Sequence, residues 1–115
     1  MHELGIANSV LEAVKAEAAR HPGARPVKVG LRVGELSGVN PDSLAFGFQA
    51  MTSGTEWEPL ALEIETCPRR HRCPSCLNTF PVAGHDFSCP VCGNPRTHCI
   101  GGEELDLAYV EMEDQ

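Results

Sequence analysis

Two stretches decide the fold of the middle of this chain: CPSC at residues 73–76 and CPVCG at residues 89–93. Each C-x2-C turn presents two thiolates to one cation, and twelve residues separate the two turns. Two such turns complete a tetrahedral shell of four sulfurs, the closed arrangement that structural zinc prefers. Two chance pairs of reduced thiols are the alternative, but the proline and glycine of the second pair are typical of a metal-binding knuckle. We therefore predict that a structural Zn(II) without an open coordination position is bound by Cys73, Cys76, Cys89 and Cys92.

The segment around these turns differs in composition from the rest of the chain. Residues 67–99 hold all six cysteines and five of the nine prolines, with four Arg against one Asp, net +3. Residues 1–66 carry a net charge of −4, and residues 100–115 carry −6. We predict an inserted zinc module at 67–99, and an α+β body formed by 1–66 together with 100–115. The module has few large apolar side chains and is expected to need the metal in order to fold.

Two cysteines and a group of basic residues in the module remain outside the zinc prediction. Cys67 and Cys99 are interpreted as spare thiols, with a disulfide or an additional metal role as alternatives. The basic residues form either a solvated face or a docking surface for an acidic partner. They are Arg69, Arg70, His71, Arg72 and Arg96.

The body contains two segments with helical signals. Apolar residues recur at steps of three and four over residues 4–19, which is the spacing of one helical face. The second helix is expected to begin after Asn40, a good N-cap, with Pro41 at its first position. Gly54 is suited to end it.

Three segments of the body alternate apolar and polar residues, as half-buried strands do. These segments are residues 27–33, 60–65 and 105–109, and a bulge or fraying is expected at 110–112. The predicted fold is α+β, with two helices packed on a three-stranded sheet and an inserted zinc-ribbon-like module.

The whole chain excludes several classes of function. It has 115 residues and a net charge of −7, so nucleic acid is a poor partner. No stretch reaches the roughly 18 apolar residues of a membrane span, and no secretory signal is evident, so a cytoplasmic protein without membrane contact is expected. No glycine-rich phosphate loop or nucleophile elbow occurs, so we expect no enzyme activity of its own.

The first three residues can chelate a metal. The α-amine of Met1, with an ordinary pKa of about 7.7–8.0, deprotonates readily. With the His2 backbone nitrogen it closes a five-membered ring, and Nδ1 of His2 then closes a six-membered ring. Three such nitrogens lie in one plane, which suits square-planar Ni(II) or Cu(II). Glu3 or His98 is a candidate for the remaining position, and a disordered terminus is the alternative interpretation.

Five motifs in order along the chain resemble the HypA/HybF family of hydrogenase nickel-incorporation proteins. They are M-H-E-L at 1–4, V-G-E-L-S-G-V at 33–39, S-L-A-F-x-F at 43–48, the two C-P-x-C knuckles, and G-x-E-L at 102–105. The resemblance implies a nickel-binding α+β domain with an inserted zinc domain. It also implies delivery of Ni(II) to the [NiFe]-hydrogenase large subunit together with the GTPase HypB, with other nickel-delivery proteins as further partners.

The resemblance also implies residue roles. It places nickel on His2, with main-chain donors at Met1, His2 and Glu3, and it places zinc on the four knuckle cysteines. Some members carry His directly after each C-x2-C, whereas this chain has Leu77 and Gly93 there. An exchange of His for Cys at the zinc is therefore not expected in this chain.

Two other classes of function fit the knuckles without a terminal metal site. The first is a zinc-ribbon adaptor that binds a protein or a nucleic acid. The second is a rubredoxin-like electron carrier, because four thiolates also suit iron and C-P-V-C-G matches its knuckle. Nickel titration and the colour of the purified protein distinguish these from a nickel carrier.

Overall fold

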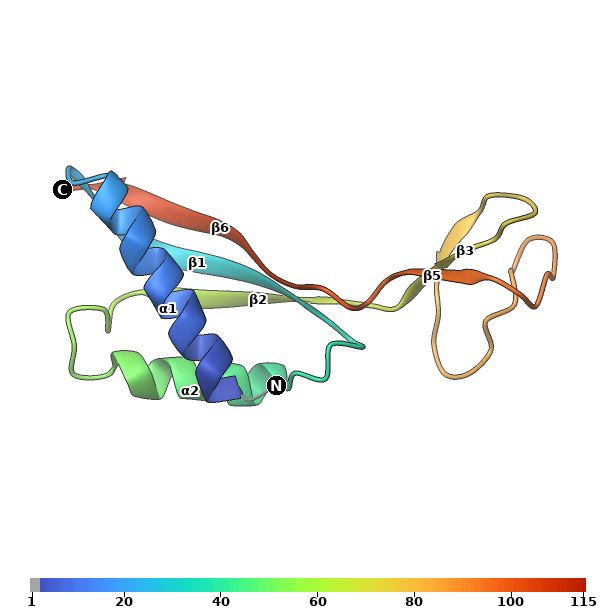
Figure 1. Ribbon diagram of the computed structural model, residues 1–115, viewed down its shortest axis with the longest axis horizontal. Helices are drawn as coiled ribbons and strands as arrows, with labels where there is room; N and C mark the ends of the chain where they lie inside the picture. Colours follow the sequence, from blue (N-terminus) through green and yellow to red (C-terminus); the bar gives the residue numbers. More distant parts are fainter. Residues whose placement is uncertain (1–2) are drawn as a thin grey trace.

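The chain forms two three-stranded sheets at the two ends of an elongated molecule of 54 × 26 × 16 Å (Figure 1). A computed structural model describes residues 3–115. The predicted nickel donors Met1 and His2 lie outside the described residues. The body sheet carries both helices, and the module sheet carries the cysteine knuckles.

The body sheet has the strand order β2-β1-β6. β1 (Ala24–Gly34) pairs in parallel with β2 (Ala61–Cys67) and antiparallel with β6 (Leu105–Asp114). α1 (Glu3–Arg20) and α2 (Pro41–Thr52) lie on one side of it (Figure 1). α2 connects the two parallel strands, which cannot be joined by a tight hairpin. The α+β fold predicted from the sequence is confirmed.

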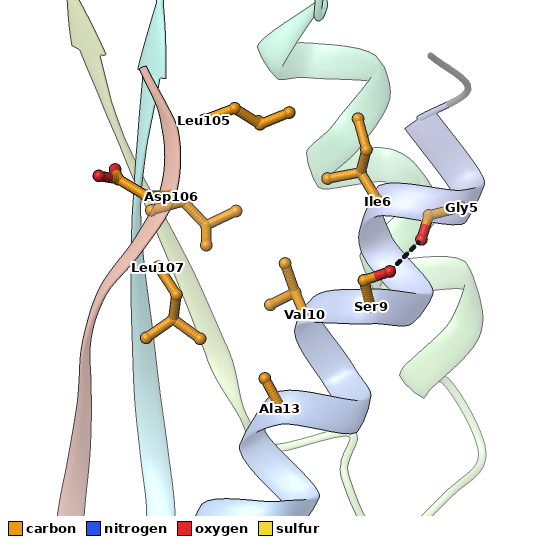
Figure 2. A pocket seen from close by; sticks show the side chains of 9 residues that line it. Gly5, Ile6, Ser9, Val10, Ala13, Leu105, Asp106 and Leu107 are labelled. Carbon is orange, nitrogen blue, oxygen red and sulfur yellow. Dashed lines mark hydrogen bonds between the residues drawn. The ribbon is translucent and has the colours of Figure 1, made fainter.

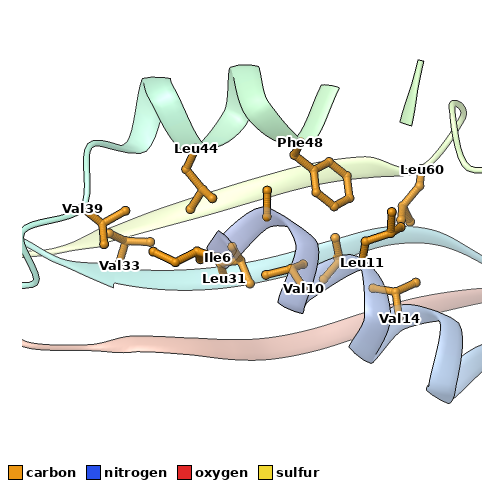
Figure 3. Close-up of a cluster of buried hydrophobic side chains, with 12 residues drawn as sticks. Ile6, Val10, Leu11, Val14, Leu31, Val33, Val39, Leu44, Phe48 and Leu60 are labelled. Carbon is orange, nitrogen blue, oxygen red and sulfur yellow. The ribbon is translucent and has the colours of Figure 1, made fainter. Parts of the chain in front are cut away.

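The hydrophobic core lies between the two helices and the inner face of β1 (Figure 3). Val29, Leu31 and Val33 alternate along β1, and at most 3% of each is exposed. Because alternate residues of a strand point to one face, this row meets both helices. The helices contribute Ile6, Ala7, Val10, Leu11, Val14, Leu44 and Phe48.

Both helices form where they were predicted, although the buried face of α1 is rotated. Ile6 and Val10 are buried, whereas Leu4, with which the apolar spacing over residues 4–19 begins, is 48% exposed. The side chain of Asn40 caps α2 as predicted, accepting a hydrogen bond from the backbone N–H of Ser43 at 3.0 Å.

The third strand differs from its prediction in one respect. Tyr109 was expected to share a face with Leu105 and Leu107, but it pairs with Gly30 while Leu107 pairs with Leu31. Ala108 is therefore an extra residue in the ladder, a β-bulge, and it turns Tyr109 to the face away from the helices. The ring of Tyr109 lies directly over Gly30, where a β-carbon would clash with it. This bulge precedes residues 110–112, but a second register shift, between Pro26 and Lys28 of β1, lies opposite Glu111 and Met112, where an irregularity was expected.

The module sheet has the order β4-β3-β5, all antiparallel. Its strands are β3 (Arg70–Arg72), β4 (Thr79–Pro81) and β5 (His98–Gly101). β2 continues to Cys67 and β5 runs to Gly101, so both ends of the expected insert lie in strands.

Backbone hydrogen bonds hold the two strands that connect module and body against the end of β1. The N–H of Leu36 donates to the carbonyl of Gly102 at 2.6 Å, and the N–H of Glu35 donates to Cys67 at 2.9 Å. A carboxylate oxygen of Glu35 accepts the N–H of Arg69 at 3.3 Å. Gly102 has φ of +112°, and a β-carbon there would lie 2.9 Å from Cα of Arg69. Only glycine fits this close crossing without strain.

Candidate metal centre

The four knuckle cysteines meet at one point of the module. Their Sγ atoms all lie within 4.8 Å of one another. Sγ of Cys73 is 3.4 Å from Sγ of Cys92, and Sγ of Cys76 is 3.5 Å from Sγ of Cys89, with no disulfide between them. Tetrahedral zinc with bonds of about 2.3 Å separates its sulfurs by about 3.8 Å. The arrangement therefore fits a four-coordinate zinc ion.

The backbone of the two knuckles is built alike. The N–H of Cys73 donates to Asn78, and the N–H of Leu77 donates back to Cys73, each at 2.9 Å. The second knuckle repeats both bonds with Cys89, Gly93 and Asn94 at the same distances. The turn requires a positive φ at the residue after the second cysteine, which is +65° at Leu77 and +80° at Gly93.

Backbone N–H groups stabilise the thiolate form of the two buried cysteines. The N–H of Cys92 lowers the pKa of Cys89 to about 6, and the N–H of Cys76 lowers the pKa of Cys73. The N–H of Asn78 acts in the same direction on Cys76, but burial and the neighbouring thiols outweigh it and raise the pKa of Cys76 to about 11. A cation removes this conflict, because it neutralises sulfurs that otherwise repel each other's charge.

Few apolar side chains support the knuckles. Cys73 and Cys89 are buried with Phe80 and Val82, and Phe87 packs against them. A cluster this small provides little hydrophobic stabilisation. The module accordingly has the composition of a unit that folds around its metal.

Arg69 and His71 lie inside the module, although the sequence placed them on a basic face. Nε of Arg69 donates to Nε2 of His71 at 2.8 Å, so the ring proton is on Nδ1, which donates to Thr97 at 2.8 Å. The imidazole stacks on Phe87 at 5.1 Å, and the guanidinium of Arg69 lies 4.1 Å from the centre of the same ring. Burial, followed by the charge of Arg69, lowers the pKa of His71. His71 is therefore buried in the module core, and the half-buried Arg69 packs against it.

Cys67 and Cys99 are free thiols and are separate from the knuckles. Cys67 ends β2 in the body sheet, whereas Cys99 pairs with His71 in the module sheet. The disulfide alternative is therefore wrong for this structure. Among residues 3–115, the knuckle cysteines are the one group of His, Cys and carboxylate side chains close enough to share a metal.

The two described candidates for nickel lie in different parts of the molecule. Glu3 is the first residue of α1, whose start lies beside α2 in the body (Figure 1). His98 is exposed on β5, in the module at the other end. The structure does not bring these two side chains together.

A groove of about 520 Å³ between α1 and β6 is apolar (Figure 2). The hydroxyl of Ser9 donates to the carbonyl of Gly5 at 3.0 Å, and the carboxylate of Asp106 binds Arg32 at 2.8 Å. The groove thus offers no nucleophile with an adjacent base. Its walls come from Ile6, Val10, Ala13, Leu31, Leu105 and Leu107.

The fold and the site define a class: a small α+β domain interrupted by a four-cysteine module that fits structural zinc. Neither α1 nor α2, the helices described within residues 3–115, combines the length and apolar character of a membrane span. A family model described as "Hydrogenase/urease nickel incorporation, metallochaperone, hypA" matches residues 1–112. The chain belongs to this family of nickel metallochaperones for hydrogenase maturation.

Curated relatives agree with this assignment. The chain is 42% identical over 113 residues to "Hydrogenase maturation factor HypA" of Geobacter metallireducens, covering 98% of this chain and 100% of the relative. It is 39% identical over 114 residues to the protein of the same name from Desulfitobacterium hafniense, covering 99% and 100%.

Two solution structures share the fold at 20% identity. One is of the "Ni metallochaperone HypA from Helicobacter pylori", with a TM-score of 0.64 and 100% of both chains covered. The other is a "HypA protein" with a TM-score of 0.72, covering 100% of this chain and 98% of the other.

Proposed function

We propose that this protein carries Ni(II) at its N-terminus and delivers it to the large subunit of a [NiFe] hydrogenase. In this proposal it acts in the cytoplasm, has no enzyme activity, and works with the GTPase HypB and other nickel-delivery proteins. The observation that carries the proposal is the match of the nickel-incorporation family across residues 1–112, which includes the chain start. GTP hydrolysis, where it is needed, comes from the partner.

The proposed nickel site uses nitrogens from consecutive residues. The α-amine of Met1, the backbone nitrogen of His2 and Nδ1 of His2 form two fused chelate rings, which favour square-planar Ni(II). The next residue, Glu3, is the start of α1, and α1 is anchored in the core by Ile6 and Ala7. The donors therefore directly precede a helix that is packed in the core, and exchange of the metal requires no rearrangement of that core.

We propose that Glu3 completes the nickel shell in preference to His98. Glu3 directly follows the other donors, whereas His98 lies in the module sheet beside Arg72. A guanidinium next to His98 disfavours a second cation there.

The four cysteines hold zinc in this proposal and have a structural role. Because all four positions are filled by protein thiolates, no water can be activated there. A purified protein that contains iron and is coloured would instead support the electron carrier, and a protein without nickel affinity would support the adaptor.

The test is calorimetric titration of Ni(II) into zinc-loaded protein that has a free N-terminus. His2→Ala, and separately a peptide tag placed before Met1, should each abolish tight nickel binding, because each removes one chelating nitrogen. His21→Ala is the matched control, since it removes an exposed imidazole near the end of α1 and should leave binding unchanged. Binding should also fall below about pH 6.5, where the imidazole and amine hold protons. Equal nickel affinity of tagged and untagged protein would refute the proposed donors.

A further inference from the structure

The basic residues of the body and of the module differ in their partners. Each of the five in the body has a carboxylate oxygen within 4.0 Å, as in the pairs Arg32–Asp106 at 2.8 Å and Lys28–Glu63 at 3.3 Å. None of the four module arginines has such a partner among residues 3–115. The other paired body cations are Lys15, Arg20 and Arg25.

The unpaired arginines do not all face solvent. The guanidinium of Arg69 lies on the Phe87 ring and donates to His71, as described above. Because side chains alternate along a strand, Arg70 and Arg72 point to the face of β3 opposite His71. Arg70 is half-buried, with its guanidinium 3.4 Å from the hydroxyl of Thr79, and Arg72 is exposed.

The outer face of β3 consequently carries basic side chains. Arg72 is flanked by Thr79 on β4 and by His98 on β5, and Arg70 is flanked by Pro81 and Gly101. One carboxylate borders this face at the Arg70 end: Glu104 accepts the N–H of Gly102 at 2.6 Å, and its other oxygen would lie 3.4 Å from a β-carbon on Gly101. It forms no ion pair with Arg70, and no described carboxylate is paired with Arg72. The module has one acidic residue, Asp86, and its carboxylate accepts the N–H of Ser88 at 3.1 Å. We call Arg70, Arg72 and His98 the basic face.

We propose that the basic face docks an extended, carboxylate-rich segment of a partner protein. Cα atoms of alternate residues on β3 are about 6.6 Å apart, and alternate carboxylates on an extended segment have the same spacing. Arginine binds carboxylates through two parallel hydrogen bonds, which fixes the orientation of the bound segment. None of the proposed nickel donors Met1, His2 and Glu3 belongs to the basic face, so this inference does not depend on nickel binding.

Two other occupants are disfavoured by charge. A nucleic acid would meet the body, whose net charge is −10, and two arginines neutralise few phosphates. A second copy would have to offer its own carboxylates. Three of those on β2 and β6 that face away from the helices, Glu63, Glu111 and Asp106, are already bound to Lys28 and Arg32.

The test measures binding of a labelled peptide of alternating Glu and Thr to the full, zinc-loaded protein by fluorescence anisotropy at low ionic strength. The double variant Arg70→Gln/Arg72→Gln should weaken binding about tenfold. Arg20→Gln/Arg25→Gln changes the net charge equally but removes only cations paired within the body, and it should change the affinity less than twofold. A peptide with Gln in place of Glu should not bind.

Four further readouts keep the test decisive: zinc content, nickel affinity, binding of DNA and self-association. Zinc content and nickel affinity should be the same in both double variants, which shows that the module is folded and the nickel site intact. Equal loss of peptide affinity in the two double variants would overturn the proposal, because net charge alone would then explain binding. Stronger binding of a single-stranded DNA oligonucleotide, or self-association that Arg70→Gln/Arg72→Gln removes, would overturn it in favour of the other occupants.

Discussion

The ring of Tyr109 packs on Gly30. We therefore predict that Gly30→Ala destabilises the wild-type protein but stabilises a Tyr109→Ala variant. Gly30 is buried in β1, and a β-carbon there would lie 2.6 Å from Cδ1 of Tyr109 and closer still to other ring atoms. Its φ is not in the left-handed region. Alanine therefore fits the backbone at this position, and the ring is the obstacle.

The magnitude follows from two opposing terms. Overpacking in a fitted site costs about 1–3 kcal/mol. Replacement of Gly by Ala in a compatible strand position stabilises by about 0.4–1 kcal/mol, because the unfolded chain loses freedom. Gly30→Ala should thus destabilise the wild-type protein by about 1–2 kcal/mol. In a Tyr109→Ala background the obstacle is absent, and Gly30→Ala should stabilise by about 0.4–1 kcal/mol.

Urea unfolding of zinc-loaded protein, followed by the fluorescence of Trp57, measures these differences. Trp57 is the one tryptophan of the chain and packs against the body core, so it reports unfolding of the body. Gly5→Ala is a matched control, because a β-carbon at this exposed position of α1 meets nothing within 4 Å. It should stabilise by up to about 1 kcal/mol in either background. Equal effects of Gly30→Ala with and without Tyr109 would refute the reasoning.

Three further predictions concern the module and its junction with the body. Cys73→Ala should lose the zinc and unfold the module while the body keeps its fluorescence transition, and Cys99→Ala should retain a full equivalent of zinc; metal analysis of both variants checks this. Gly102→Ala should lower the stability of the module by about 2 kcal/mol, because Gly102 has a left-handed φ and a β-carbon there would contact Arg69. Hydrogen exchange of the module amides measures this loss, and unchanged protection of these amides would contradict it. Arg69→Ala should lower zinc affinity about tenfold, because its guanidinium is part of the module core, whereas Arg72→Ala should leave it within twofold in a chelator competition.

Local patterns predicted the elements of the body because each is set by neighbouring residues. Alternation predicted the strands around Val29 and Ile64, and the Asn40–Pro41 cap predicted the start of α2. The same reasoning placed Tyr109 on the wrong face, because the pattern of β6 indicated an irregularity near residues 110–112 but did not show that Ala108 is an extra residue. The position of a bulge depends on the pairing of β6 with β1, so it cannot be read from one strand alone.

In the module, too, the sequence pattern did not predict which charged side chains face outward. The run from Arg69 to Arg72 was predicted as one basic face, yet Arg69 and His71 are packed against Phe87 while Arg70 and Arg72 face outward. The period of two in a strand separates these pairs, but three residues are too few to identify a strand from sequence alone. Charge by itself indicated exposure for all of them, and aromatic packing inside the module overrides it for two.

The two metal sites differ in how far they depend on the fold. The zinc site needs two knuckles that are twelve residues apart, and the structure brings their sulfurs together. The proposed nickel donors at Met1 and His2 are consecutive, so their chelate rings close through covalent geometry and require no tertiary contact. His98 could join them only if the module approached the start of α1, and the hydrogen bonds of Glu35, Leu36 and Gly102 hold the connecting strands along β1 instead. The same geometry leaves His98 beside Arg72 on the basic face, where its proposed role is to contact a partner.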